Sequence, residues 1–312
     1  MVVACVLVFL ELFARFYLGL GDPALVQVHP TIEYYFKPNQ VAHPFGNLFR
    51  TNRYGMRSDD FPPRKTQPRE LRVLVFGDSV VNGGNLTDHS RLATTLLQSR
   101  LAQELHRPVM VGNISAGSWG PPNQLAYIKQ FGFFDADIAI FVLSSSDSSD
   151  APTFEPLNPF THPTVAPFSA AWEGATRYLP RYWHWRSALE PVPPPGMRET
   201  INPRDVEVSI AAEREFLDLA RSAGLTAMVL QHWEASELDA QLPEFGHDEI
   251  LRAAKASGVP VYQDAGVLRQ YMAKGLSPYR DNIHLNDTGQ RAYADILLDM
   301  LKRDAGTKLQ PP

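Results

Sequence analysis

The sequence predicts an α/β fold in which a five-stranded parallel sheet carries helices on both faces. Five short runs rich in Val and Ile have the length and composition of strands buried on both sides: 71–77, 108–114, 138–144, 225–231 and 259–263. Helical stretches alternate with these runs, at 90–105, 122–131, 206–223, 248–257, 265–273 and 286–303. Strands that alternate with helices in this way are typical of a doubly wound sheet.

The first 21 residues begin with an apolar run that is followed by Glu11 and Arg15. The run is shorter than the roughly 20 residues that a bilayer span requires, and it lacks the basic start and cleavage site of a signal peptide. Glu11 and Arg15 lie one helical turn apart and can pair, as at the interfacial end of a membrane helix. We expect residues 1–21 to form a membrane-anchor helix that begins before this sequence does, or else an amphipathic helix packed on the domain.

Residues 22–70 are rich in Pro, Asn and aromatic side chains and show neither a helical nor an alternating period. The density of aromatic residues favours an extended connector docked on a core over a free linker. Residues 34–39 and 51–57 are its expected ordered pieces, and the Asn-Arg-Tyr-Gly run at 52–55 is equally consistent with a surface turn.

Composition excludes several classes of function. The chain has 312 residues, of which 44% are hydrophobic, and a formal net charge of -5 leaves no basic excess for a nucleic-acid partner. Cys5 is the only cysteine, so neither an internal disulfide nor a cysteine zinc site can form. The histidines lack metal-ligand spacing, and no glycine-rich phosphate loop follows a strand, so we expect no metal and no cofactor.

A serine follows the first predicted strand of the sheet, and a histidine precedes the last predicted helix. Gly-Asp-Ser at 77–79 stands at the carboxyl end of a buried strand, where open α/β sheets bind their ligands. A serine nucleophile needs a neutral imidazole as its base and an acid that holds the imidazole in the right tautomer. We therefore expect Ser79, His284 and Asp281 to form a catalytic triad. The Gly-x-Ser-x-Gly elbow of the larger α/β-hydrolase fold is absent from the sequence.

These two motifs in this order resemble those of the Gly-Asp-Ser-Leu-type or SGNH hydrolases, over about residues 71–303. The resemblance implies a flavodoxin-like α/β/α sandwich with Ser79 as nucleophile and Asp281 and His284 as acid and base. It also implies an oxyanion hole made by the Ser79 and Gly117 N–H groups, because Asn-Ile-Ser-Ala-Gly follows the second strand. The family usually has an Asn after the third strand as a further donor. Ser146 stands there in this chain, so the third donor is either this shorter side chain or another group.

Residues 150–205 interrupt the hydrolase domain, which we expect to span 71–305. This insertion is rich in Pro and aromatic residues and leaves the sheet at the edge where Ser79 emerges. We expect it to be a lid or a substrate platform, or else a packed structural excursion. His232 and Trp233 follow the fourth strand at the same edge, and we expect them to line the substrate pocket unless they fill the core.

The Glu11–Arg15 helix end, the connector at 22–70 and the catalytic motifs together resemble those of membrane-anchored, extracytoplasmic bacterial members of the family. The resemblance implies a serine esterase that removes or transfers acetyl groups on a small-molecule or polysaccharide ester through an acyl-serine. It also implies a periplasmic or cell-surface catalytic domain attached to the membrane by the N-terminal helix. Two alternatives stay open: a lipid or thioester acyl hydrolase, and a catalytically silent glycan-binding or polysaccharide-assembly component.

Overall fold

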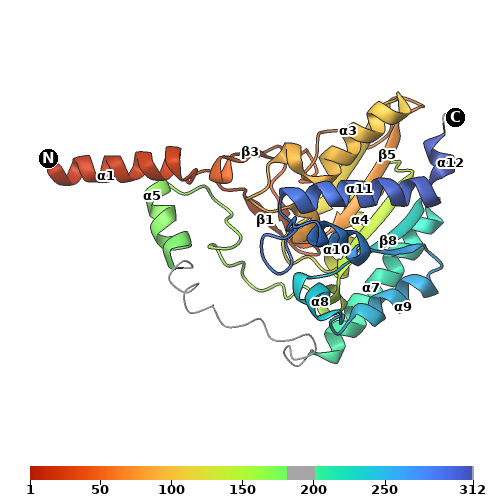
Figure 1. Cartoon of the computed structure of the whole chain (residues 1–312). Coiled ribbons are helices and arrows are strands. Elements are labelled where there is room, and N and C mark those ends of the chain that lie inside the picture. Colours follow the sequence, from red (N-terminus) through yellow and green to blue (C-terminus); the bar gives the residue numbers. More distant parts are fainter. Residues whose placement is uncertain (181–200, 311–312) are drawn as a thin grey trace.

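A five-stranded parallel sheet forms the centre of the computed structural model, which describes residues 1–180 and 201–310 (Figure 1). The strand order is β6-β5-β7-β8-β9. The strands are β5 (Leu71–Gly77), β6 (Val109–Ser115), β7 (Ile138–Ser144), β8 (Thr226–His232) and β9 (Val261–Gln263). The predicted parallel sheet is thus confirmed, and each strand boundary lies within two residues of its predicted position.

Helices cover both faces of the sheet, as predicted. One face carries α2 (Ser79–Asn82), α3 (Ala93–Leu105), α10 (Ala265–Ala273) and α11 (Asp287–Asp304). The other face carries α4 (Pro121–Phe131), α7 (Pro203–Ser222) and α9 (His247–Ala256). Shorter elements join them: η3 (His89–Arg91), η4 (Ser145–Ser149), α8 (Ala235–Ala240) and α12 (Gly306–Leu309).

The two faces of the sheet bury alternate residues of each strand. In β5, Val73 and Val75 face the layer that contains α3 and α11, whereas Leu74 and Phe76 face the layer that contains α4 and α7. Burial of each such side chain contributes about 1.5–3 kcal/mol. Because β5 pairs with both β6 and β7, the direction of the strand order reverses at β5. Its carboxyl end, which leads to Ser79, is therefore at the switch point where such sheets form their ligand crevice.

The connector lies against the domain through two small hairpins and several buried side chains. Its elements are β1 (Val26–His29), β2 (Glu33–Phe36), β3 (Val41–Ala42), η2 (Pro44–Gly46) and β4 (Phe49–Arg50). Ile32, Met56 and Phe61 are buried in the same cluster as Leu74 and Phe76. The aromatic and apolar residues of this segment therefore extend the core on the α4 side of the sheet.

Arg57 ties the connector to the loop that follows α2. Its buried guanidinium donates to the carbonyl oxygens of Asn82, Gly84 and Thr87, and it stacks 4.2 Å from the centre of the Phe49 ring. Burial lowers the Arg57 pKa to about 9. The two terminal NH₂ groups of Arg57 thus bind three carbonyl oxygens, whereas its buried Nε has no hydrogen-bond partner among the described residues. These bonds fix the chain just beyond the predicted nucleophile.

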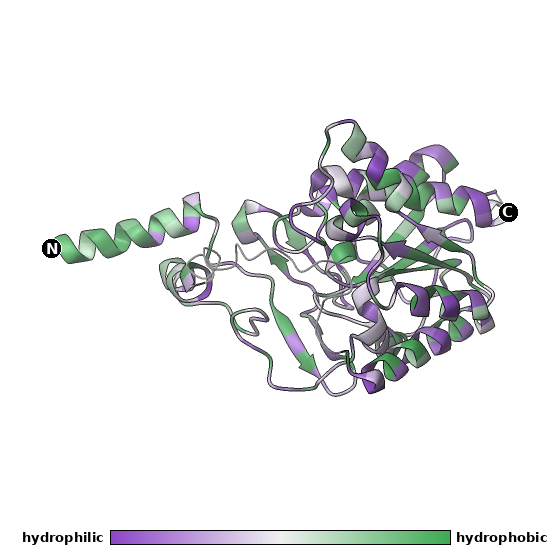
Figure 2. Ribbon diagram, turned by 60° about the horizontal axis from the view of Figure 1, so that its bottom comes forward, coloured by the Kyte–Doolittle hydropathy of each residue, from purple (hydrophilic) through white to green (hydrophobic). Residues whose placement is uncertain are grey.

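The N-terminal helix projects from the body of the domain and lies beside helix α5 (Ala170–Glu173) of the insertion (Figure 1). It comprises α1 (Val2–Leu12) and the π-helical turn η1 (Phe13–Tyr17). The turn η1 contacts α5, and α5 continues into a second π-helical turn, η5 (Gly174–Tyr178). Apolar residues colour α1 green along most of its length in Figure 2. Within residues 1–180 and 201–310, no helix combines the length and the hydropathy that a membrane span requires.

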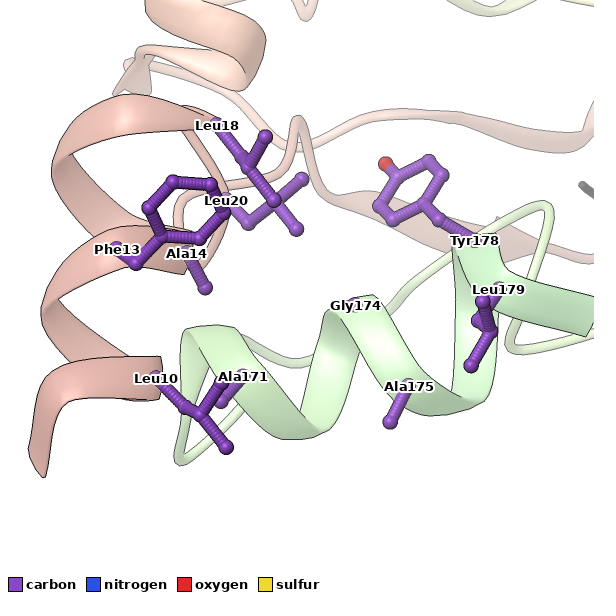
Figure 3. Close-up of a pocket in the computed structure, with 10 residues that line it drawn as sticks. All are labelled: Leu10, Phe13, Ala14, Leu18, Leu20, Ala171, Gly174, Ala175, Tyr178 and Leu179. Atoms are coloured by element: carbon purple, nitrogen blue, oxygen red, sulfur yellow. The ribbon is translucent and has the colours of Figure 1, made fainter. Parts of the chain in front are cut away.

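Glu11 joins the N-terminal helix to the insertion. Its carboxylate pairs with Arg15 at 2.7 Å and accepts hydrogen bonds from the Ser169 hydroxyl and the Ala171 N–H. These hydrogen bonds lower the Glu11 pKa to about 2. Between the two helical segments lies an apolar pocket of about 760 Å³, lined by side chains such as Leu10 and Leu179 (Figure 3). The proline run of the insertion, at 191–195, lies outside the described residues.

Candidate active site

The turn between β5 and α2 places Ser79 at the carboxyl edge of the sheet. A Cβ on Gly77 would lie 2.4 Å from Val81 Cγ2, so only glycine lets α2 pack this closely on the end of the strand. Asp78 caps α2 by accepting a hydrogen bond from the Val80 N–H at 2.8 Å. Burial raises the pKa of Asp78, and the Val80 N–H partly opposes that effect. As the first residue of α2, Ser79 has a backbone N–H without an intrahelical acceptor.

Ser79, His284 and Asp281 form a hydrogen-bonded series although Ser79 lies about two hundred residues before the other two. His284 Nε2 is 2.9 Å from Ser79 Oγ, and His284 Nδ1 is 2.8 Å from an Asp281 carboxylate oxygen. The structure thus brings together the nucleophile, base and acid that the sequence predicts. This is the geometry in which a neutral imidazole accepts the serine proton and a carboxylate holds the Nδ1–H tautomer.

The Asp281 carboxylate also shapes the loop that carries His284. Asp281 Oδ1 accepts hydrogen bonds from the backbone N–H groups of Ile283 and His284, at 3.1 and 2.7 Å. Partial burial raises the pKa of Asp281, but the hydrogen bonds from His284 outweigh this and lower it to about 2. Asp281 is therefore ionised at neutral pH, as an acid that stabilises a developing imidazolium must be.

Gly117 lies in the same pocket as Ser79, and the connector fixes its position. The Tyr34 hydroxyl donates a hydrogen bond to the Gly117 carbonyl oxygen. Burial raises the pKa of Tyr34 above its usual range, so this hydroxyl stays protonated and remains a donor. The Tyr34 hydrogen bond therefore holds the backbone at Gly117 beside Ser79, and the resemblance implies the Gly117 N–H as an oxyanion donor.

Ser146 lies outside this pocket, contrary to the expectation that it donates to the oxyanion. Its side chain is exposed, and its Oγ contacts Ser144 Oγ at 3.0 Å. Asp147 causes this arrangement, because its carboxylate accepts from the Ser144 N–H at 2.6 Å and from the Ser144 hydroxyl at 3.0 Å and so closes the turn. Of the three expected oxyanion donors, Ser79 and Gly117 line the pocket and Ser146 does not.

The pocket beside Ser79 measures about 140 Å³ and is built from four segments of the chain. The connector, the α2 loop, the peptide at Gly117 and the insertion each contribute, and the lining residues include Val26, Tyr34, Phe36, Asn82, Thr161, His162, Pro163 and Arg177. The insertion is fastened here, since the Val26 N–H donates to the Pro163 carbonyl at 2.9 Å. Sequence reasoning missed Tyr34, His162 and Arg177, because no local motif connects them with Ser79.

His232 and Trp233 are core residues and do not line the pocket beside Ser79, which corrects the expectation that they bind substrate. His232 is fully buried, and its Nδ1 lies 2.6 Å from Asp264 Oδ2. Trp233 is 8% exposed and packs edge-on against His247. The loop that carries His284 covers the end of β8, so side chains at this strand end do not reach solvent.

Comparisons with known proteins give structural likenesses at low sequence identity. No protein-family profile and no curated protein matches the sequence. Similar solved structures include a lipase/acylhydrolase from Enterococcus faecalis, with 13% identity, a TM-score of 0.47 and coverage of 78% of this chain and 98% of that chain. An acetyl-xylooligosaccharide esterase variant from Geobacillus stearmophilus has 12% identity, a TM-score of 0.44 and coverage of 76% and 94%. The esterase EstA from Pseudoalteromonas has 10% identity, a TM-score of 0.45 and coverage of 75% and 98%. These values are too low to carry an activity or a substrate over to this chain.

Proposed function

We propose that this chain is a serine esterase of the SGNH type that removes or transfers acetyl groups on carbohydrate or exported polysaccharide. The observation that carries the esterase proposal is the hydrogen-bonded series from Ser79 through His284 to Asp281. His284 is partly exposed, and it lies 2.9 Å from a serine at the switch point of the sheet, so this contact is not a matter of core packing. That placement is what nucleophilic catalysis requires.

The proposed reaction is a double displacement at Ser79. His284 Nε2 accepts the hydroxyl proton while Ser79 Oγ attacks the ester carbonyl, and the N–H groups of Ser79 and Gly117 stabilise the oxyanion. His284 then returns the proton to the departing alcohol, which leaves an acyl-serine. Water or a sugar hydroxyl attacks this ester with His284 again as base, which completes hydrolysis or transfer.

The size of the pocket supports a short acyl group. At about 140 Å³ it is smaller than the roughly 300–1,000 Å³ of pockets that hold drug-sized ligands. Val26, Phe36 and Pro163 give it an apolar side on which an acetyl methyl group can pack. We therefore assign the acyl group to this pocket and expect activity to fall as the acyl chain lengthens.

A second pocket, of about 280 Å³, supports a carbohydrate as the alcohol part of the ester. It shares Tyr34, Thr161 and His162 with the first pocket, so the two adjoin. Its lining also includes Glu33 and Asp150, and burial raises the Asp150 pKa to about 7. Carboxyl groups of this kind exchange hydrogen bonds with sugar hydroxyls, and an aromatic ring offers a face for a sugar ring to pack on.

The alternative of a lipid or thioester acyl hydrolase would need a long apolar pocket at the nucleophile. The apolar pocket of about 760 Å³ lies between α1 and α5, and none of its lining residues borders the pocket beside Ser79. The alternative of a catalytically silent component rests on Ser146, which stands outside the pocket, whereas all three triad side chains remain in contact.

The test of this proposal is turnover by the full chain in mild detergent, with p-nitrophenyl esters from acetate to octanoate beside the Ser79→Ala variant. We expect kcat/KM to be highest for acetate and to vanish in the variant. Acetate release from O-acetylated oligosaccharides then tests the carbohydrate part. Turnover that persists in Ser79→Ala would contradict the esterase proposal, and a preference for octanoate would favour the lipid alternative.

We also propose that α1 attaches the catalytic domain to a membrane, with the domain outside the cytoplasm. A helix that is apolar around its whole circumference yet exposed along its length is costly in water, and α1 is such a helix up to Glu11. Flotation with phosphatidylcholine/phosphatidylglycerol vesicles checks the attachment. Leu7→Glu should reduce flotation, whereas Leu242→Glu, at an exposed apolar position outside α1, should not. Equal flotation of both variants would contradict it.

A further inference from the structure

The buried side chain of His232 is hydrogen-bonded at both ring nitrogens. Nδ1 lies 2.6 Å from Asp264 Oδ2, and Nε2 lies 2.9 Å from the carbonyl oxygen of Ile283. The Asp264 carboxylate and the Ile283 carbonyl are both acceptors, and the Tyr293 hydroxyl, 2.6 Å from Nδ1, donates to Asp264, so this arrangement favours a proton on each ring nitrogen, that is, an imidazolium. Burial acts to lower the His232 pKa, but Asp264 and the Ile283 carbonyl outweigh it and raise the pKa to about 9.

Asp264 is itself held by several donors in the core. Its Oδ2 accepts a hydrogen bond from the Tyr293 hydroxyl at 2.6 Å, and its Oδ1 accepts one from the Trp233 N–H at 3.0 Å. The Tyr279 ring packs on the other side of His232, and the Asp78 carboxylate contributes a further negative charge nearby. The imidazolium therefore sits in a fixed site whose partners are the N-cap residue of α10, a tyrosine of α11 and the loop before His284.

Ile283, whose carbonyl His232 binds, is the residue immediately before His284. The preceding residue, Asn282, is held by the segment that follows β8. Its carbonyl accepts from the Ala235 N–H at 2.8 Å, and its side-chain oxygen accepts from the Ser236 N–H at 3.0 Å. The last residue of β8 and the first residues of α8 thus bind the loop between the acid and the base of the triad.

We propose that His232 is a positioning residue for the triad, which holds the Ile283 carbonyl and thereby aims His284 at Ser79. The proposal rests on the proposed esterase function, and His232 takes no part in proton transfer. The His284 side chain is 30% exposed, so its position within hydrogen-bond reach of Ser79 depends on the backbone of the loop that carries it. A misplacement of about 1 Å in a reacting group can cost 10²-fold in rate.

The test compares full-chain variants of His232 with a matched control. His232→Phe removes both hydrogen bonds and keeps a planar ring. Asp264→Asn keeps an acceptor for Trp233 and lets a neutral His232 still donate from Nε2 to Ile283. Tyr127→Phe is the control, because the buried Tyr127 hydroxyl also donates to a loop carbonyl, that of Tyr54, at 2.8 Å.

We expect His232→Phe to lower kcat for p-nitrophenyl acetate about 10–100-fold with KM within twofold. The kcat of Asp264→Asn should lie between those of His232→Phe and the wild type, and Tyr127→Phe should keep the wild-type kcat per folded molecule. A kcat within threefold of the wild type in folded His232→Phe would overturn the proposal.

Hydrogen exchange of residues 281–285, followed by mass spectrometry, separates this inference from the esterase proposal because it needs no turnover. Exchange there should quicken at least about tenfold in His232→Phe and stay unchanged in Tyr127→Phe. If His232→Phe does not fold, Asp264→Asn carries the test through a smaller rise in exchange and a partial loss of kcat. Unchanged exchange in the variants would overturn the positioning role, whereas an inactive wild type with the expected exchange would overturn only the esterase function.

Discussion

Replacement of Asp281 by Asn tests the base more selectively than deletion of His284 would. The backbone N–H groups of Ile283 and His284 can still donate to the amide oxygen at position 281, so the loop keeps its local hydrogen bonds. The amide NH₂ group would instead face His284 Nδ1, which favours the tautomer with the proton on Nε2. In that tautomer, His284 cannot accept the proton of Ser79.

The expected loss follows from the exposure of the acid. In the serine-protease template, where the acid is buried, the Asp-to-Asn change lowers kcat about 10⁴-fold. The Asp281 side chain is 49% exposed, so water competes for His284 Nδ1 and weakens the electrostatic part of the interaction. We therefore expect kcat to fall about 10²–10³-fold, which corresponds to about 3–4 kcal/mol of activation free energy.

The assay is steady-state hydrolysis of p-nitrophenyl acetate at pH 7.5 by folded Asp281→Asn, beside the wild type and Asp287→Asn. Asp287 is a nearby acid that pairs with Arg91 at the start of α11, so its variant should keep kcat within about twofold. KM should be unchanged in both variants, because neither side chain borders the pocket beside Ser79. A kcat for Asp281→Asn within threefold of the wild type would refute the assigned role of the acid.

Three further predictions concern the loop after α2, the missing donor and the response to pH. Arg57→Met should lower the free energy of unfolding by about 3–5 kcal/mol, measured by urea denaturation, because three buried carbonyls lose a charged donor; a loss below about 1 kcal/mol would contradict this. Ser146→Ala should change kcat less than about threefold, since its hydroxyl lies outside the pocket, and a loss of 10²-fold in kinetic assays would show that it binds the oxyanion. The folded-state pKa of His232, about 9, lies above its usual value of about 6.5, so its stabilisation is complete below about pH 6.5 and is lost as pH rises through 9. Between pH 6.5 and 10, the unfolding free energy of the wild type should therefore fall by up to about 3 kcal/mol more than that of His232→Phe. Equal pH profiles of the two proteins would count against the imidazolium.

The strands and the triad could be predicted because their signals are local. Unbroken runs of Val, Ile and Leu at 71–77 and 138–144 have few stable alternatives to a buried parallel strand. The spacing of Asp281 and His284 lets a short loop bring the carboxylate to Nδ1 without help from the rest of the fold. Ser79 could be identified from its place directly after a buried strand, where open α/β sheets bind their ligands.

The walls of the pocket could not be predicted, because they depend on packing between distant segments. Tyr34 reaches Gly117 only because the connector folds back on the domain. His162 packs on Tyr34 because the insertion is hydrogen-bonded to β1 at Val26. His232 stands at a strand end, which indicates an edge of the sheet but not what covers it. There the 281–285 loop buries the ring and changes its role from the predicted substrate contact to support of the loop.

Whether Ser79 is the nucleophile can be read directly from the site of covalent labelling by a fluorophosphonate probe, mapped by peptide mass spectrometry on the full chain. An activated serine attacks such a probe, whereas an ordinary surface serine does not. We expect one adduct, on Ser79, that forms at least about 10²-fold more slowly in Asp281→Asn. A wild-type protein that stays unlabelled, or carries its adduct on another residue, would contradict this role of Ser79.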